Sequence, residues 1–205
     1  MQQTIADFFG DLSPFQIITA ILSFIGGIYA LVEVLRRVKV KFYPADSIGF
    51  VLSKGEYVSK FHLRCNLVNK TSKLGVVHRL EVEVRSPENK IYKFPWKLFY
   101  EYKPGAGAVQ KETDPYPIAV MPKNNQTLFI EFEAANSVQS SEWILGRYKF
   151  KVIGWVNQKD RNSKPNLESE FHINIDQVIH NKFSQAHSGP TVYSVPVEEW
   201  VLPTG

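Results

Sequence analysis

The stretch FHLRCNLVN, residues 61–69, alternates apolar and polar side chains almost without a break. The apolar set is Phe61, Leu63, Cys65 and Leu67, and the polar set is His62, Arg64 and Asn66. A period of two is typical of a β-strand that turns one face to a core and the other to solvent. The stretch therefore predicts a half-buried antiparallel strand.

The same alternation recurs along the chain. It is found in LEVEVR (80–85), LFIEFEA (128–134) and FHINID (171–176). Segments rich in turn-forming residues, such as NQKDRNSKPN (157–166), separate these stretches. Because no helical period interrupts the strands, we expect a mainly β domain over residues 38–176, built as a two-sheet sandwich and not as a parallel α/β sheet.

The stretch EWILGRYKFKVIGWV, residues 142–156, carries a resemblance to a known family. Its Leu-Gly-x-Tyr start resembles the penultimate strand of immunoglobulin-like and fibronectin-III-like sandwiches. The resemblance implies that Tyr148 closes a corner of the fold through its hydroxyl, and that FHINID is the last core strand. Cys65 is the only cysteine, so the domain would be one of the sandwiches without a disulfide, and a reducing compartment is allowed.

Two pieces follow the sandwich. Residues 177–189 predict a short helix that begins near Asp176, with an apolar stripe of Ile179, Phe183 and Ala186. The tail, residues 190–205, is predicted to be extended. It either packs on its own domain or adds as an edge strand to a neighbouring protein.

The N-terminal part contains a long apolar run. Residues 15–35 hold 21 residues with Glu33 as their single charge, which corresponds to a helix of about 31 Å, close to the thickness of a bilayer core. Ser13, Pro14 and Gln16 form a capping signal before it. The preceding residues 1–14 lack the positive charge of a signal peptide, and the run lacks the polar period of a core helix. The sequence predicts a transmembrane helix over residues 15–37.

The flanking charges predict an orientation. RRVKVK (36–41) follows the run, whereas only two acidic residues precede it. The positive-inside rule then places the C-terminal domain in the cytoplasm, under the inner or plasma membrane, with the N-terminus outside. The charges expected at the membrane interface are Glu33, Arg36, Arg37, Lys39 and Lys41. An anchored domain on the outer side is the competing interpretation, because Asn69–Thr71 and Asn125–Thr127 are glycosylation tripeptides.

Small residues lie on one stripe of the predicted membrane helix. They are Ser23, Gly26, Gly27 and Ala30, which form two overlapping small-x-x-x-small pairs. Such a stripe lets helices approach closely and predicts self-association. The alternative is that glycine and alanine are simply frequent in membrane helices.

The stretch KIYKFPWKLFYEYK, residues 90–103, mixes aromatic rings with lysines. The predicted partner or ligand surface consists of Tyr92, Lys93, Trp96, Lys97, Tyr100, Tyr102 and Lys103. Such a surface suits a protein partner, a lipid interface, or a nucleotide or single-stranded nucleic acid. The competing interpretation is a hairpin strand whose rings fill the core while its lysines stay in solvent. The formal net charge of the domain is +5, which is far below the net charge of a typical nucleic-acid-binding domain.

The sequence shows no catalytic or metal-binding motif, so we expect neither an enzyme nor a cofactor. His62, His172, His180 and His187 do not stand at zinc-site spacing with a second ligand. Cys65 falls on the apolar face of its strand and is expected to be a core residue. The predicted function is a single-pass membrane-anchored binding or scaffolding protein. The alternative is an oligomerising effector whose helices cluster and perturb the bilayer.

Overall fold

The computed structural model describes residues 13–52, 58–102, 109–160, 162–185 and 191–201. The chain divides into two compact units, residues 1–37 and residues 38–205.

The first unit contains the helix α2 (Pro14–Leu35). Ser13 caps it: the Gln16 amide donates to Ser13 Oγ at 3.3 Å, and the Ser13 amide donates to Gln16 Oε1 at 2.8 Å. This reciprocal pair confirms the predicted capping box. In the described part of the chain, α2 is the one helix that is long and apolar enough to cross a bilayer.

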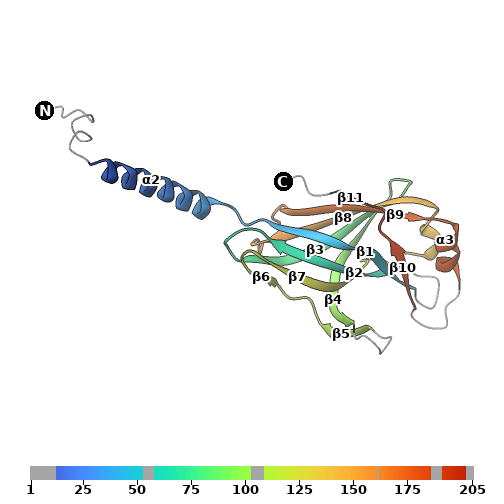
Figure 1. Cartoon of the computed structure of the whole chain (residues 1–205). Helices are drawn as coiled ribbons and strands as arrows, with labels where there is room; N and C mark the ends of the chain where they lie inside the picture. The colour runs from blue at the N-terminus through green and yellow to red at the C-terminus, as the bar shows by residue number, and fades with distance from the viewer. Residues whose placement is uncertain (1–12, 53–57, 103–108, 161, 186–190, 202–205) are drawn as a thin grey trace. The chain divides into compact units, whose positions relative to one another are not determined.

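The second unit is mainly antiparallel β-structure (Figure 1). The strands are β1 (Val40–Leu52), β2 (Lys60–Asn69), β3 (Gly75–Arg85), β4 (Ile91–Tyr102), β5 (Val109–Thr113), β6 (Ile118–Val120), β7 (Asn124–Glu133), β8 (Gly146–Val156), β9 (Leu167–Ile175), β10 (Thr191–Pro196) and β11 (Glu199–Val201). They form one sheet in the order β10-β1-β2-β7-β4-β3-β8-β9-β11, with β5 beside β4 and β6 beside β3.

One strand joins the two halves of this sheet, where the sequence predicted two separate sheets. Residues 91–95 of β4 pair with β3, and from Trp96 onward β4 pairs with β7. A register shift between Trp96 and Leu98 marks the change of partner directly after Pro95, which has no N–H to donate. Bulges bend a strand and increase its twist. The sheet therefore curves round and becomes nearly barrel-shaped.

The C-terminal tail lies across the seam between the two ends of this sheet. β10 pairs with β1, and β11 pairs with β9. Only two residues separate β10 from β11 beyond Pro196, and both are held: the Val197 amide donates to Asp46 O at 2.8 Å and the Glu198 amide to His172 O at 2.9 Å. The described part of the tail thus pairs with its own domain.

Aromatic rings from both halves of the sheet meet in one core. Phe61 of β2 lies 5.4 Å from Phe132 of β7 and 5.7 Å from Phe150 of β8, measured between ring centroids. Trp143, next to the short 3-10 helix η1 (Ser140–Glu142), is 2% exposed and donates from Nε1 to Val58 O at 3.1 Å. Its ring lies 5.1 Å from that of Phe50.

Tyr148 occupies the position that the resemblance assigned to a corner residue. It is fully buried at the start of β8, and its hydroxyl donates to Ile144 O at 3.2 Å. Burial raises the pKa of this hydroxyl, so it remains a donor over the physiological range. The bond joins the strand to the chain just before it.

The short helix α3 (Gln177–Ser184) closes the end of the domain opposite to the start of β1 (Figure 1). Asp176 caps it by accepting from the Ile179 amide at 2.8 Å. Ile179 and Phe183 are buried, and the Phe183 ring lies 5.0 Å from Phe50. Ala186, the third residue of the predicted stripe, lies outside the described residues.

Candidate functional site

Most aromatic residues of the predicted surface on β4 pack into the domain. Tyr92 is half-buried, stacks on Trp143 at 6.4 Å and donates from its hydroxyl to Glu142 Oε2 at 3.1 Å. Burial, together with the Glu142 carboxylate, raises the pKa of Tyr92 to about 12. Tyr100 is buried, with its ring 4.3 Å from that of His62. The Tyr100 ring is therefore not available to a partner, whereas Tyr92 is partly exposed.

The lysines of the same stretch are bound to carboxylates on neighbouring strands. Lys93 Nζ lies 3.4 Å from Glu83 on β3, and Lys97 Nζ lies 3.4 Å from Glu133 on β7. The side chain of Tyr102 and the whole of Lys103 lie outside the described residues. Of the described residues of the predicted surface, Tyr100 is thus buried, whereas Lys93 and Lys97 are exposed and Tyr92 and Trp96 are half-buried.

Trp96 is the exception among the predicted residues, because it lines a cavity of about 240 Å³. The other lining residues are His78, Arg79, Trp155, Gln158, Lys159 and Asp160. We call this cavity the Arg79 pocket. It combines two indole rings with two permanent cations and one carboxylate.

A bulge in β3 places two consecutive side chains in the Arg79 pocket. The pairing of β3 with β8 shifts register between Val77 and Arg79, leaving His78 as the extra residue. His78 and Arg79 are both half-buried, while Val77 and Leu80 on either side of them are fully buried. Bulges are frequent beside functional sites because they redirect side chains. On the paired strand, Trp155 stands directly opposite Arg79.

The Arg79 guanidinium is held by stacking. Its Cζ lies 3.5 Å from the centroid of the Trp155 ring, and Trp155 is 6% exposed. Arg79 Nε is buried without a hydrogen-bond partner, and the same is true of Gln158 Oε1. Among the described residues, no carboxylate forms an ion pair with Arg79. The pocket thus contains a cation that forms no ion pair with the described residues and whose Nε is unpaired, and such a group favours an anionic ligand.

The loop that forms one wall of the pocket is fixed at both ends by asparagine side chains. The Val76 amide donates to Asn157 Oδ1 at 2.7 Å, and Asn157 has a positive φ of 54°. Asn166 accepts from the Val156 amide at 2.7 Å and donates back to its carbonyl at 2.9 Å. Between them, Trp155 Nε1 donates to Ser163 O at 2.6 Å. These bonds position the loop residues that line the pocket.

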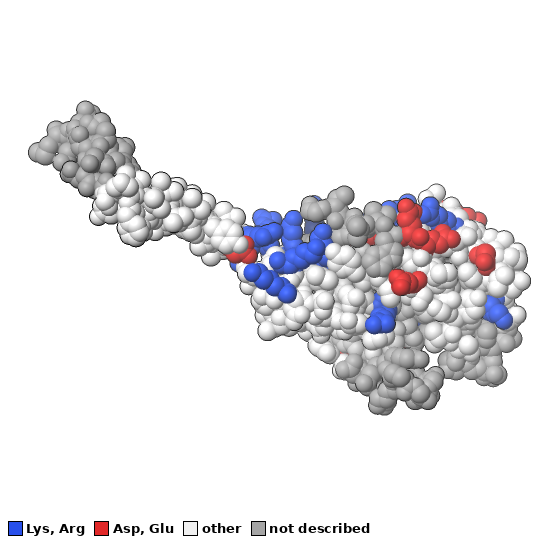
Figure 2. Space-filling view, in the orientation of Figure 1, with Lys and Arg blue, Asp and Glu red and all other residues white. Residues whose placement is uncertain are grey.

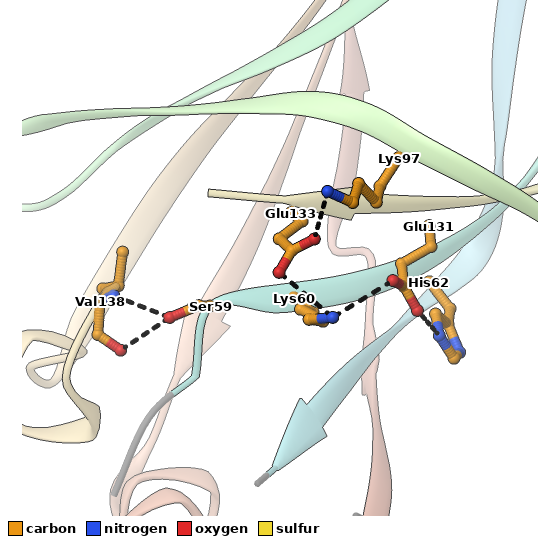
Figure 3. A network of polar contacts seen from close by, with 7 residues as sticks. All are labelled: Ser59, Lys60, His62, Lys97, Glu131, Glu133 and Val138. Atoms are coloured by element: carbon orange, nitrogen blue, oxygen red, sulfur yellow. Dashed lines mark hydrogen bonds and ion pairs between the residues drawn. The ribbon is translucent and has the colours of Figure 1, made fainter. Parts of the chain in front are cut away.

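A second polar cluster lies on the outer face of β2, β7 and β4 (Figure 3). His62 Nε2 donates to Glu131 Oε2 at 2.9 Å, and Lys60 Nζ lies 3.7 Å from the other oxygen of Glu131. Glu133 lies between Lys60, at 3.2 Å, and Lys97. Burial alone would raise the pKa of Glu131, but the bond from His62 and the charge of Lys60 outweigh it, so this pKa lies below its ordinary value. We assign a stabilising role to the cluster.

Replacing Glu131 with glutamine is expected to lower the free energy of unfolding at pH 7 by about 1–3 kcal/mol, because it removes the charge from two interactions of a side chain that is 12% exposed. Since the folded-state pKa of Glu131 is depressed, this stabilisation is present above the unfolded-state pKa and is lost as pH falls through the folded-state pKa. Glu131→Gln should therefore also flatten the loss of stability below about pH 4.5. Urea unfolding of the full chain in nonionic detergent at several pH values measures both effects.

Glu133→Gln is the matched control for this prediction. Glu133 is more exposed than Glu131, with 27% against 12% of its side chain accessible, and its partner Lys97 is 62% exposed. We expect Glu133→Gln to lower the free energy of unfolding by less than about 1 kcal/mol. Equal losses in the two variants would contradict the role given to Glu131.

The predicted residues of the helix lie as follows. Ser23, Gly26, Gly27 and Ala30 are all exposed, and a Cβ added at either glycine meets nothing within 4 Å. Glu33, one of the charges expected at the membrane interface, pairs with Arg36 at 3.7 Å. Arg37 and Lys39 are exposed, whereas Lys41 is half-buried.

The remaining candidates do not form a reactive centre. Cys65 is buried on the core face of β2, and burial raises the pKa of its thiol, so it is not a thiolate. No group of three or more His, Cys, Asp and Glu side chains in the described ranges is placed to hold a metal ion. Among the residues that the structure describes, the Arg79 pocket combines a cavity with two buried polar atoms that lack a hydrogen-bond partner. The sequence did not reveal it, because its strands pair residues that are far apart along the chain.

Comparison with known proteins identifies one structure with weak similarity. No family model matches the chain, and no curated protein matches it. The structure is similar to the solution structure of a late embryogenesis abundant (LEA) protein, with a TM-score of 0.38 and 11% sequence identity, over 78% of this chain and 83% of the other. At this level of similarity, neither a fold family nor a function follows from the match.

Proposed function

We propose that this protein is a single-pass membrane-anchored binding module whose β-domain takes a small organic anion in the Arg79 pocket. The observation that supports it most directly is that Arg79, whose guanidinium stacks on Trp155 and has a buried, unpaired Nε, lines a cavity. The sequence pointed to the aromatic and lysine residues of β4, and Trp96 connects that prediction to the pocket.

The side chains of the pocket define the ligand class. A guanidinium presents its donors as a planar fork that matches a carboxylate or a phosphate. Lys159 adds a second positive charge, and Asp160 is the single carboxylate among the lining residues. Trp96 offers an indole on which a flat ring can stack. The fitting ligand is therefore a flat ring that carries one carboxylate or phosphate group.

The anchor is supported by the character of α2. The helix has 22 residues, none of which is buried, as expected if lipid covers its apolar side chains. On this proposal Arg36, Arg37 and Lys39 lie at the cytoplasmic headgroups, and the domain faces the cytoplasm. The Asn69–Thr71 tripeptide agrees with this side, because Asn69 is 1% exposed and its amide is bonded within the domain.

Titration of the purified full chain in nonionic detergent tests the ligand site. Phenyl phosphate and uridine 5′-monophosphate serve as flat anions, and inorganic phosphate serves as the anion without a ring. We expect saturable quenching of tryptophan fluorescence by at least one of the two ring compounds, with weaker binding of inorganic phosphate. Arg79→Gln should weaken binding of the ring compound about 10–100-fold, since it removes a charge-assisted contact.

Arg64→Gln is the matched control, because Arg64 also lies over an aromatic ring, 5.4 Å from the centroid of Phe129, but on the exposed face of β2. This variant should bind within about twofold of the native chain. Absence of saturable quenching by both ring compounds, or equal loss of binding in the two arginine variants, would overturn the proposed site.

Two finer assignments belong to the same proposal. The immunoglobulin-like classification is supported by the bond from the Tyr148 hydroxyl to the chain just before β8. Association of helices through Gly26 and Gly27 would make the chain an oligomer. Replacing both glycines with leucine separates the two functions, because ligand binding should survive the change and clustering should not.

A further inference from the structure

Four segments that are far apart in sequence meet at the end of the domain where β1 begins. Val40 pairs with Asn69, and Asn69 pairs with Asn124. Gly75 pairs with Val120, and the Asn157 amide donates to Val76 O at 2.7 Å. The described residues of the segments 38–41, 69–76, 118–125 and 157–166 therefore share one end, which we call the basic end.

The side chain of Asn69 organises this end. Its Nδ2 donates to Lys73 O at 2.7 Å and to Val120 O at 3.0 Å, and its Oδ1 accepts from the Thr71 hydroxyl at 2.7 Å. The Lys123 amide donates to Thr71 O at 3.0 Å, with a positive φ of 51° at Lys123. The turns that carry the lysines are thus fixed against one another.

The charge of the domain is concentrated there. In sequence, the four segments carry eight basic residues and one acidic residue, whereas the rest of the domain carries 14 basic and 16 acidic residues. The described basic residues of the four segments are Lys39, Lys41, Lys70, Lys73, Lys123, Lys159 and Lys164. Figure 2 shows Lys and Arg gathered at this end. The domain therefore has a strongly cationic surface at one end, although its net charge is modest.

A hollow lies between two of these lysines. It has a volume of about 340 Å³ and is lined by Val68, Asn69, Lys70, Lys123, Asn124 and Asn125. Among the described residues, neither Lys70 nor Lys123 forms an ion pair with a carboxylate. Two ammonium groups with neighbouring amide side chains suit a phosphodiester, whose oxygens accept from both kinds of donor.

We infer that the basic end docks on anionic lipid headgroups, with one headgroup in the hollow between Lys70 and Lys123. The inference rests on the proposed membrane anchor. Four residues separate Leu35, the last residue of α2, from Val40, the first of β1. Five Cα–Cα steps at about 3.5 Å each keep Val40, one residue of the basic end, within about 18 Å of Leu35. A basic surface held this close gains about fivefold in partition for each lysine near anionic lipid.

Lysine footprinting of the full chain in nanodiscs tests the docking. Discs of phosphatidylcholine alone are compared with discs that contain 30% phosphatidylglycerol, and acetylation rates are read by mass spectrometry. Lys70 and Lys123 should react about fivefold more slowly in the anionic discs, and the protection should fall in 0.5 M NaCl. Lys90 and Lys182, which are exposed on the opposite end, should react at equal rates in both.

Variants and a competitor complete the design. Lys70→Gln with Lys123→Gln should remove the protection of Lys73 and Lys159, whereas Lys90→Gln with Lys182→Gln should leave it unchanged. Equal rates in both lipids, or protection that extends equally to Lys90 and Lys182, would overturn the inference while leaving the anchor intact. Stronger protection by added single-stranded RNA in neutral discs would assign the surface to nucleic acid instead. A chain that does not enter the discs would overturn the anchor itself.

Discussion

Two arginines at the centre of α2, Leu22→Arg with Ile25→Arg, are expected to release the chain from the membrane. An arginine near the middle of a membrane helix costs about 2.5–3.5 kcal/mol on insertion, so the pair costs about 5–7 kcal/mol and shifts the equilibrium by roughly 10⁴–10⁵-fold. Both native residues are exposed on the helix and apolar, as lipid-facing positions should be. The measurement is the fraction of the full chain that stays in the membrane pellet after alkaline extraction.

The control for this variant places the same charges near the end of the helix. Val34→Arg with Leu35→Arg should stay in the pellet, because arginines near a helix end extend to the headgroups. Retention of the central variant at the native level would contradict a membrane span in α2. Release of both variants would show that charge at any position disrupts the helix.

Trp143→Ala is expected to lower the free energy of unfolding of the domain by about 3–5 kcal/mol, the range for an aromatic residue removed from a core. The ring contacts Phe50, Tyr148 and Phe183 from three separate elements. The change also removes the donor to Val58 O, which leaves a buried carbonyl without that partner. Urea unfolding of the full chain in nonionic detergent, followed by near-ultraviolet circular dichroism, measures the loss.

Trp96→Ala is the matched control, since it removes the same side chain from the half-buried wall of the Arg79 pocket. Trp96→Ala should lower the free energy of unfolding by less than half as much as Trp143→Ala. A loss below about 1 kcal/mol for Trp143→Ala, or equal losses in the two variants, would contradict the central place given to Trp143 in the core.

The local features of the fold were predictable from the sequence. The capping box at Ser13 and Gln16 and the cap at Asp176 depend on residues a few positions apart, and both form as their spacing indicates. The alternation in residues 61–69 likewise predicts a strand, because side-chain period and burial are local properties of the backbone. The inward position of Cys65 follows from the same alternation.

The joining of the two sheet halves was not predictable in the same way. Proline within a sheet is confined to edges and bulges, and β4 carries a bulge next to Pro95, at the centre of the sheet. The change of partner from β3 to β7 depends on the registers of both neighbours, which no short stretch encodes. For the same reason the rings of Tyr92 and Tyr100, equally suited to a surface or a core, could not be assigned from their spacing.

The Arg79 pocket and the basic end could not be predicted from the sequence, and the reason is the same for both. Arg79 and Trp155 meet only because β3 and β8 pair with a bulge beside them. The lysines of the basic end come from four separate turns, and only RRVKVK among them stands out as a cluster in the sequence. Sites of this kind follow from strand register and not from motifs.

The most direct test of the account is the accessibility of a single cysteine in the membrane-bound full chain. Cys65 is buried, so Lys182→Cys on α3 introduces the one exposed thiol among the described residues. In spheroplasts that express this variant, an impermeant maleimide should label residue 182 only after the membrane is permeabilised, and the chain should stay in the pellet after alkaline extraction. Labelling before permeabilisation, or a chain found in the alkaline supernatant, would contradict an anchored domain on the cytoplasmic side.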